Sequence, residues 1–264
     1  MASILDRFRL DGQVAIITGA GRGIGAATAI AYADAGADVV ISARTRSELE
    51  ETAEQVRARG QRALVITCDV MEAGQRKDLV AQAVAEFGRL DILVNNAGGW
   101  GPKPALETTD EDFDACFHFN VTTAFSLSRL SVPQMVATAG KGAIVNISST
   151  AGIHPQPGFA AYGTGKAALS WLTRELAQDF APRVRVNAIG VGAILTSALA
   201  NFMNEELEQT MLARTPLARL GAAEDIAACA LYLASPAADY VTGEIYGVNG
   251  GITTSQVQMP RAAL

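Results

Sequence analysis

The chain has 264 residues, of which 49% are hydrophobic and 18% charged, with 25 glycines and 9 prolines. This balance excludes a disordered, collagen-like or coiled-coil protein and favours one large globular domain over residues 1–264. The formal net charge of −6 offers no positive field to a polyanion, so nucleic acid is not expected as a partner.

Cysteine usage and the N-terminal residues bear on the compartment. Cys68, Cys116 and Cys229 are odd in number and widely spaced, which predicts reduced thiols rather than disulfides or a metal site. The first ten residues carry three charged side chains where a signal peptide would need an apolar stretch. The longest uncharged run, residues 186–204, is too polar and too rich in glycine to span a bilayer. We therefore expect a cytoplasmic protein with no membrane contact and no bound metal.

Short β-branched runs alternate with longer helical patterns along the chain. The predicted strands are Val14–Thr18, Asp38–Ser42, Arg62–Thr67, Asp91–Asn95, Ala143–Ile147, Arg185–Ile189 and Glu244–Val248. The predicted helices are Ile24–Ala35, Ser47–Ala58, Glu72–Phe87, Asp110–Ala139, Tyr162–Phe180 and Glu224–Leu233. This alternation predicts a Rossmann-type α/β fold, a doubly wound parallel seven-stranded sheet with helices on both faces. Ligands of such sheets bind beyond the carboxyl ends of the strands.

The first predicted strand leads into a glycine-rich turn, residues 18–25, and then into an alanine-rich helix. Glycines here allow a sharp turn and a close approach of a pyrophosphate to the free N–H groups at the start of the helix. The pattern predicts a dinucleotide site at Gly19, Gly23, Ile24 and Gly25. The alternative is a turn that serves only helix packing.

The end of the second predicted strand bears on the choice of cofactor. A dinucleotide site usually has a carboxylate there for the adenosine ribose, but this chain has Ala43 followed by Arg44. Guanidinium groups at Arg44 and Arg22 would suit a 2′-phosphate, which predicts NADP(H) in preference to NAD(H). The alternative is that Arg44 points into solvent.

Two further turns follow strands. Asp69 and Val70 come after the third, where the Asp69 carboxylate could accept a hydrogen bond from an adenine amino group or could cap the next helix. Asn96, Ala97 and Gly98 come after the fourth strand and are predicted to line the cofactor site.

A tyrosine and a lysine lie four residues apart at the start of a predicted helix. The spacing of Tyr162 and Lys166 puts both side chains on one helical face, where an ammonium can favour a phenolate. Ser148 and Ser149 directly follow the preceding buried strand, and a hydroxyl there could hold a substrate oxygen.

These motifs, in this order and spacing, resemble those of the short-chain dehydrogenase/reductase family over about residues 10–252. The resemblance implies Tyr162 as general acid/base and Lys166 as its electrostatic and ribose-binding partner. Ser149, thirteen residues before the tyrosine, matches the family serine. Asn120 corresponds to the asparagine that kinks a long helix and holds a water in a proton relay.

Within the family, the turns around residues 91–104, 192–196 and 235–238 are most similar to bacterial 7α-hydroxysteroid dehydrogenases and related actinobacterial reductases. Gly192 and Thr196 match residues on the nicotinamide side of the cofactor. Two departures stand out, Ala43 in place of an aspartate and Val191 in place of the usual proline.

The resemblance implies an enzyme that interconverts a secondary alcohol and a ketone with NADP(H). A hydroxysteroid-like or other bulky apolar ketone is the expected substrate, under a lid at about residues 194–214 in which Leu199, Phe202, Met203 and Leu207 could form the apolar surface. Trp100, His154 and Phe159 are candidates for the opposite wall, although a lone histidine beside a proline is typical of a loop.

Two alternative functions remain open. One alternative is a 3-oxoacyl-thioester reductase, and the other is a non-catalytic NADP(H)-sensing regulator with the same fold. The resemblance implies a homotetramer that packs through the helices at 110–139 and 162–180 and through the C-terminal strand region.

Overall fold

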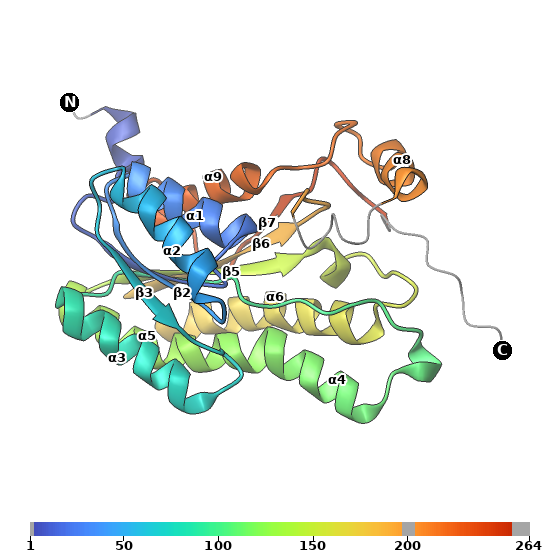
Figure 1. The fold of residues 1–264 in the computed structure, drawn as a ribbon, viewed down its shortest axis with the longest axis horizontal. Helices are drawn as coiled ribbons and strands as arrows, with labels where there is room; N and C mark the ends of the chain where they lie inside the picture. The colour runs from blue at the N-terminus through green and yellow to red at the C-terminus, as the bar shows by residue number, and fades with distance from the viewer. Residues whose placement is uncertain (1–2, 197–203, 255–264) are drawn as a thin grey trace.

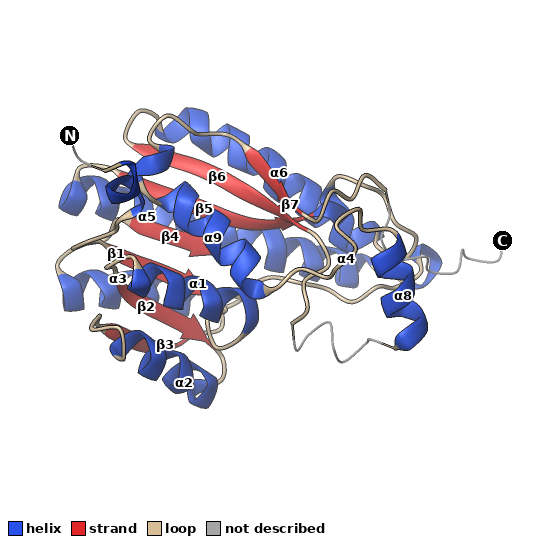
Figure 2. Ribbon diagram, turned by 90° about the horizontal axis from the view of Figure 1, so that it is seen from above, coloured by secondary structure: helices blue, strands red, loops and turns tan. Residues whose placement is uncertain are grey.

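The fold was analysed in a computed structural model that describes residues 3–196 and 204–254. A short 3₁₀ turn, Ile4–Phe8, precedes the first strand. The strands are β1 Val14–Thr18, β2 Asp38–Ala43, β3 Ala63–Thr67, β4 Ile92–Asn95, β5 Gly142–Ser149, β6 Val184–Val191 and β7 Ile245–Val248. All the strand pairs are parallel, and they form one seven-stranded sheet in the order β3-β2-β1-β4-β5-β6-β7 (Figure 2).

Helices cover both faces of the sheet. The α-helices of the described residues are α1 Gly23–Asp34, α2 Arg46–Arg57, α3 Ala73–Phe87, α4 Asp110–Phe117, α5 Thr123–Ala139, α6 Ala160–Phe180, α8 Glu205–Ala213 and α9 Ala223–Ala234, of which α8 lies beyond the end of the sheet. α1, α2 and α9 lie on one face, and α3, α4, α5 and α6 lie on the other (Figure 1). The prediction of a doubly wound parallel sheet is therefore confirmed.

A hydrophobic core fills each side of the sheet because β-branched and leucine side chains alternate between its faces. Ile17 and Val94 pack toward α1 and α9, whereas Ile16, Val40 and Leu93 pack toward α3, α5 and α6. The order of the strands reverses between β1 and β4, so the helices that follow these two strands, α1 and α4, lie on opposite faces of the sheet. The separation of the two helices leaves space above the carboxyl ends of the strands, which is where the sequence predicts the site.

The structure corrects several predicted elements. The single helix expected at 110–139 is divided into α4 and α5 by a π-helical turn, His118–Thr122, which contains Asn120, the residue at which the family resemblance implies a kink. β5 extends to Ser149 and β6 to Val191, beyond their predicted ends, because these residues continue the ladder as partners of one another. α8 was not predicted; its N-cap residue, Asn204, accepts a hydrogen bond from the Leu207 amide at 2.8 Å.

No helix in residues 3–196 and 204–254 is both long and apolar enough to cross a membrane.

Candidate active site

The glycine-rich turn between β1 and α1 is built for close backbone approach. Gly19 and Gly23 have φ of +64° and +57°, and a Cβ on Gly25 would lie 2.3 Å from the carbonyl oxygen of Gly19. α1 begins at Gly23 without a side-chain cap, so its first N–H groups are available to an anion. These features fit the pyrophosphate of a dinucleotide.

The turn after β4 is hydrogen-bonded to the end of β1. Asn96 Nδ2 donates to the carbonyl oxygens of Thr18 and Gly19, at 2.8 and 3.1 Å. Thr18 Oγ1 in turn accepts from the amides of Asn96 and Ala97, both at 3.0 Å. The two turns that meet at the strand-order reversal are therefore fixed relative to each other.

Between these turns and α6 lies a cavity of about 660 Å³. Most of the predicted site residues line it: Gly19, Arg22, Gly23, Ile24, Arg44, Asp69, Val70, Asn96, Ala97, Gly98, Ser149, Tyr162, Lys166, Gly192 and Thr196. Gly25 and Asn120 do not line it. Gly25 is buried beneath the glycine-rich turn, and Asn120 lies behind Gly98.

One end of the cavity lies at the carboxyl end of β2, where the sequence predicts the adenosine of a cofactor; we call it the adenosine end, and it is bounded by Gly21, Arg22, Ala43, Arg44 and Glu48. Arg44 is exposed there, and Arg22 Nη1 lies 3.3 Å from Glu48 Oε1. The absence of an acidic residue at the tip of β2 was correctly read from the sequence. A carboxylate nevertheless reaches this end of the cavity from the first turn of α2.

Asp69 lies beside the adenosine end and holds a local turn. Its Oδ1 accepts from the Met71 amide at 2.9 Å, and its own amide donates to Gln75 Oε1 at 2.7 Å. Glu72, not Asp69, is the N-cap residue of α3, and its side chain makes no capping hydrogen bond. Asp69 is therefore not the cap of this helix, and the turn that it holds keeps its carboxylate beside the cavity.

At the other end of the cavity, β5 and α6 bring three polar side chains together. Lys166 is only 4% exposed; its Nζ donates to the Ile147 carbonyl oxygen at 2.8 Å and lies 5.7 Å from the centre of the Tyr162 ring. Ser149 Oγ accepts from the Ala151 amide at 3.1 Å. One helical turn separates Tyr162 from Lys166, and Ser149 faces Tyr162 from the end of β5.

Burial controls the protonation of these groups. It lowers the pKa of Lys166 from its ordinary value of 10.5 to about 8. Burial also raises the pKa of the Tyr162 phenol, and a hydrogen bond with Ser149 opposes that rise. Desolvation outweighs this hydrogen bond, so the pKa of the Tyr162 phenol lies above its ordinary value of 10.

The π-helical turn positions Asn120, whose side chain is buried. Asn120 Nδ2 donates to the carbonyl oxygens of Cys116 and Gly99, at 2.9 and 3.2 Å, and its Oδ1 accepts from the Gly99 amide at 2.9 Å. A Cβ on Gly98 would lie 2.9 Å from Asn120 Oδ1 and 3.2 Å from Lys166 Nζ. Asn120 therefore ties the helix to the turn after β4 and lies close to the lysine.

The residues after β6 complete the cavity. Val191 occupies the position of the usual proline and stays in the ladder, paired with Ser149 and Val248. The amide of Gly192 then donates to the Val248 carbonyl oxygen at 3.0 Å. Cγ2 of Thr196 lies 3.4 Å from where a Cβ of Gly23 would be, so this segment closes over the start of α1.

The expected lid is only partly within the described residues. Leu199, Phe202 and Met203 lie outside them, whereas Leu207 is a half-buried residue of α8. Of the residues expected on the opposite wall, Trp100 lines the cavity and His154 and Phe159 do not.

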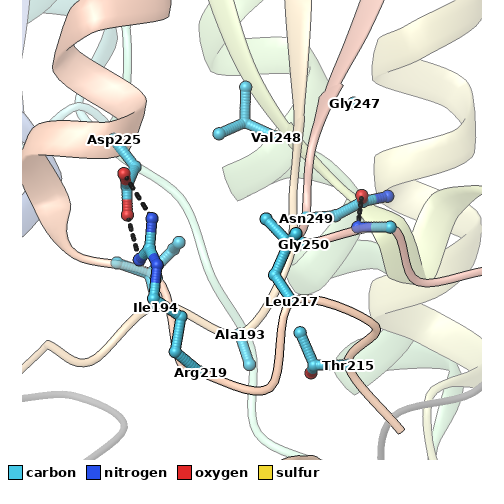
Figure 3. A pocket seen from close by; sticks show the side chains of 12 residues that line it. Ala193, Ile194, Thr215, Leu217, Arg219, Asp225, Gly247, Val248, Asn249 and Gly250 are labelled. Carbon is cyan, nitrogen blue, oxygen red and sulfur yellow. Dashed lines mark hydrogen bonds and ion pairs between the residues drawn. The ribbon is translucent and has the colours of Figure 1, made fainter.

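A second cavity, of about 440 Å³, lies beside the carboxyl ends of β6 and β7. Figure 3 shows Arg219 and Asp225 facing each other on one side of it and Asn249 on another. The Arg219 guanidinium donates to both oxygens of Asp225, at 2.7 and 2.9 Å. None of the residues expected to be catalytic lines this cavity.

The sequence reasoning missed several wall residues of the large cavity. Glu48 and Thr45 come from the start of α2, and Ala115 and Phe119 come from α4 and the π-helical turn. No local motif marks them, because they reach the site only through the packing of helices against the sheet. Among the described residues, no group of three or more His, Cys, Asp or Glu side chains is arranged as a metal site.

The sequence is similar to those of known oxidoreductases over nearly its whole length. The family model described as enoyl-(acyl carrier protein) reductase matches residues 19–253. An uncharacterized oxidoreductase of Mycobacterium tuberculosis (strain CDC 1551 / Oshkosh) is 52% identical over 97% of this chain and 98% of its own. The 7α-hydroxysteroid dehydrogenase of Escherichia coli (strain K12) is 43% identical over 93% of this chain and 96% of its own.

Solved structures extend the likeness to the whole fold. A 7α-hydroxysteroid dehydrogenase complexed with NADH and 7-oxo glycochenodeoxycholic acid superposes with a TM-score of 0.93. It is 41% identical in sequence, and the match covers 97% of this chain and all of that one. The chain therefore belongs to the short-chain dehydrogenase/reductase family, oxidoreductases that act on CH–OH groups with a nicotinamide cofactor.

Proposed function

We propose that this protein reduces a bulky apolar ketone to a secondary alcohol, and catalyses the reverse oxidation, with NADP(H) preferred over NAD(H). The observation that carries the proposal is the meeting of Ser149, Tyr162 and Lys166 at one end of a cavity whose other end is bounded by Arg22 and Arg44. A non-catalytic sensor would need only the cofactor end of that cavity.

The chain's own residues divide the work of the reaction. When bound, the reduced nicotinamide supplies the hydride. The Tyr162 hydroxyl donates a proton to the carbonyl oxygen as the negative charge develops there. The Ser149 hydroxyl donates a hydrogen bond to the same oxygen and orients it. Lys166, a buried cation one turn away, favours the phenolate that Tyr162 becomes.

Asn120 supports this group as a positioning residue. Its contacts with Gly99 and Cys116 hold the turn after β4 beside Lys166. A water held there would connect the lysine to solvent, as the family resemblance implies.

A hydroxysteroid-like ketone is the proposed substrate class. The 43% and 41% identities to 7α-hydroxysteroid dehydrogenases support it, as do the apolar side chains of Trp100 and Phe119 on the cavity wall. The preference for NADP(H) is supported by Arg22 and Arg44 at the adenosine end, where β2 ends in Ala43 instead of a carboxylate.

The proposal extends to assembly and compartment. Phe113, Phe125 and Trp171 are exposed on α4, α5 and α6, and such apolar surface suits the interface of a homotetramer. The cytoplasm is the proposed compartment, where all three cysteines would stay reduced.

The function is tested with purified protein, NADPH and a panel of 7-oxo and other bulky ketones, followed at the absorbance of NADPH. We expect turnover, and we expect Tyr162→Phe to lower kcat by about 10²–10⁴-fold while NADPH binding is retained. The matched control is Tyr240→Phe, which removes the hydroxyl of a fully exposed tyrosine. Silence of the wild type over the panel, with NADPH bound, would contradict catalysis and favour the sensing alternative.

A further inference from the structure

Glu48 places a negative charge where the sequence predicts only positive ones. It lies in the first turn of α2, and its side chain is one-third exposed. Its Oε1 lies 3.3 Å from Arg22 Nη1, and its Oε2 would lie 3.1 Å from a Cβ on Gly21. The carboxylate thus lies against the glycine-rich turn, at the wall that also includes Ala43 and Arg44.

This wall is the part of the cavity that distinguishes the two nicotinamide cofactors. NAD(H) presents a ribose 2′-hydroxyl here and NADP(H) a 2′-phosphate with nearly two negative charges. A carboxylate repels the phosphate, and it also holds one of the two guanidinium groups that would bind it. It does not repel a hydroxyl, which can donate a hydrogen bond to it.

We propose that Glu48 is a specificity-determining residue that weakens the binding of NADP(H) relative to NAD(H), chiefly by holding Arg22. The inference rests on the proposed function only in taking the large cavity as the dinucleotide site. Arg44, whose exposed side chain lies on the same wall, is the guanidinium that remains available when Glu48 holds Arg22. The cofactor preference is then the balance of Arg22 and Arg44 against Glu48.

The test is equilibrium binding of NADPH and of NADH to the full chain, measured by cofactor fluorescence or calorimetry without any ketone. The measured quantity is the ratio of the NADH dissociation constant to the NADPH dissociation constant. Removing the Glu48 charge frees the Arg22 guanidinium to bind the 2′-phosphate and also removes a screened repulsion, and in a solvent-accessible site the two effects together amount to about tenfold. We expect Glu48→Gln to raise the ratio about tenfold, because the amide keeps the size of the side chain without its charge.

Glu50→Gln is the matched control. Glu50 lies on the same helix and pairs with Arg46 at 2.8 Å, but it does not line the cavity. Its substitution should change the ratio less than twofold. An unchanged ratio in folded Glu48→Gln protein, or an equal change in Glu50→Gln protein, overturns the proposal.

The role of Arg22 is tested by repeating the Glu48 substitution in an Arg22→Gln background. If Glu48 acts by holding Arg22, its effect should fall to about threefold or less there, since no guanidinium is released. An effect that keeps its full size in that background overturns the proposed route through Arg22.

These results separate the inference from the proposed function. A wild-type protein that binds NADH more tightly than NADPH contradicts the NADP preference, yet the effect of Glu48→Gln on the ratio is still measured. A protein that binds both cofactors but reduces no ketone contradicts only the proposed reaction.

Discussion

Lys166 shows how burial tunes a single residue for this chemistry. Desolvation brings its pKa to about 8, and its Nζ donates a hydrogen bond to the Ile147 carbonyl oxygen at 2.8 Å. Nζ also lies close to Gly98 and to the Tyr162 ring, on the wall of the large cavity. A lysine with this pKa is mostly a cation at pH 7 and loses its charge in mildly alkaline solution.

Ketone reduction should therefore depend on pH through Lys166. Reduction needs Tyr162 to carry its proton and Lys166 its charge, so kcat/KM for reduction should fall as the pH rises through about 8. Lys166→Arg, which keeps a cation at all these pH values, should be slower but should lose that alkaline limb. If folded Lys166→Arg protein shows the same alkaline fall in kcat/KM as the wild type, a group other than Lys166 is responsible for it.

At the scale of elements, a buried polar network joins the strands to α5 and α6 beneath the site. Asn95 Nδ2 donates to Asn146 Oδ1 and to Ser128 Oγ, at 2.9 and 3.2 Å. Asn146 Nδ2 donates to Thr173 Oγ1 at 2.9 Å. The network thus connects β4, β5 and α6, the elements that carry the turn after β4, Ser149 and Lys166.

Breaking this network should destabilise the fold. Asn146→Ala removes two hydrogen bonds between buried groups and leaves a small void, which should lower the free energy of unfolding by about 2–3 kcal/mol. For a chain of this size the melting temperature should drop by about 4–12 °C. Calorimetry of Asn146→Ala, Thr173→Val and the double variant checks this prediction. Because the two side chains are hydrogen-bonded to each other, the double variant should lose less stability than the sum of the two single losses. Additive losses would show that the two residues act separately.

The loop before α9 is held by an ion pair that should respond to acid. Asp225 accepts from Arg219 and from the Ala222 amide, and these bonds lower its pKa to about 2. Because the folded pKa is depressed, the stabilisation is present above the unfolded value of about 4 and is lost as the pH falls through about 2. The pair is solvent-screened, with side chains 55% and 32% exposed, so its contribution is about 0.5–1 kcal/mol.

Asp225→Asn should accordingly be less stable than the wild type by about 0.5–1 kcal/mol at pH 7. The difference should shrink as the pH is lowered from about 4 toward 2, since the wild-type carboxyl then becomes neutral as well. Urea unfolding at a series of pH values measures both. Glu224→Gln, in the same turn of α9, is the control, and a difference that stays constant with pH would contradict the assignment.

At the scale of the whole molecule, α4, α5 and α6 form an outer layer with exposed aromatic side chains. Phe113, Phe125 and Trp171 are 36%, 41% and 60% exposed, although the cores on both faces of the sheet are filled. Aromatic groups left in water on neighbouring helices favour association, because burial of their surface is favourable.

Charges placed in this layer should disrupt the proposed tetramer. We expect the wild type to elute at about four times the chain mass of 27.6 kDa and the Phe125→Asp, Trp171→Asp double variant to elute as a smaller species. Size-exclusion chromatography with light scattering measures this. Leu106→Asp changes an even more exposed apolar residue outside these helices and should leave the mass unchanged. A double variant of wild-type mass would place the interface elsewhere.

The sequence by itself determined the sheet, its class and most of the residues that line the large cavity. Local signals were sufficient because each depends on residues close together in the chain. They are the glycines that need positive φ, the β-branched runs of the strands and the four-residue spacing of Tyr162 and Lys166. The family resemblance implied the break at Asn120, and the tertiary structure shows the contacts with Gly99 that hold it. The tertiary structure alone decided the long end of β5 and the position of Glu48, which depend on contacts between elements far apart in the chain: Ser149 with Val191, and Glu48 with Arg22. A local pattern cannot encode such pairings, because the energy of each exists only after the helices have packed on the sheet.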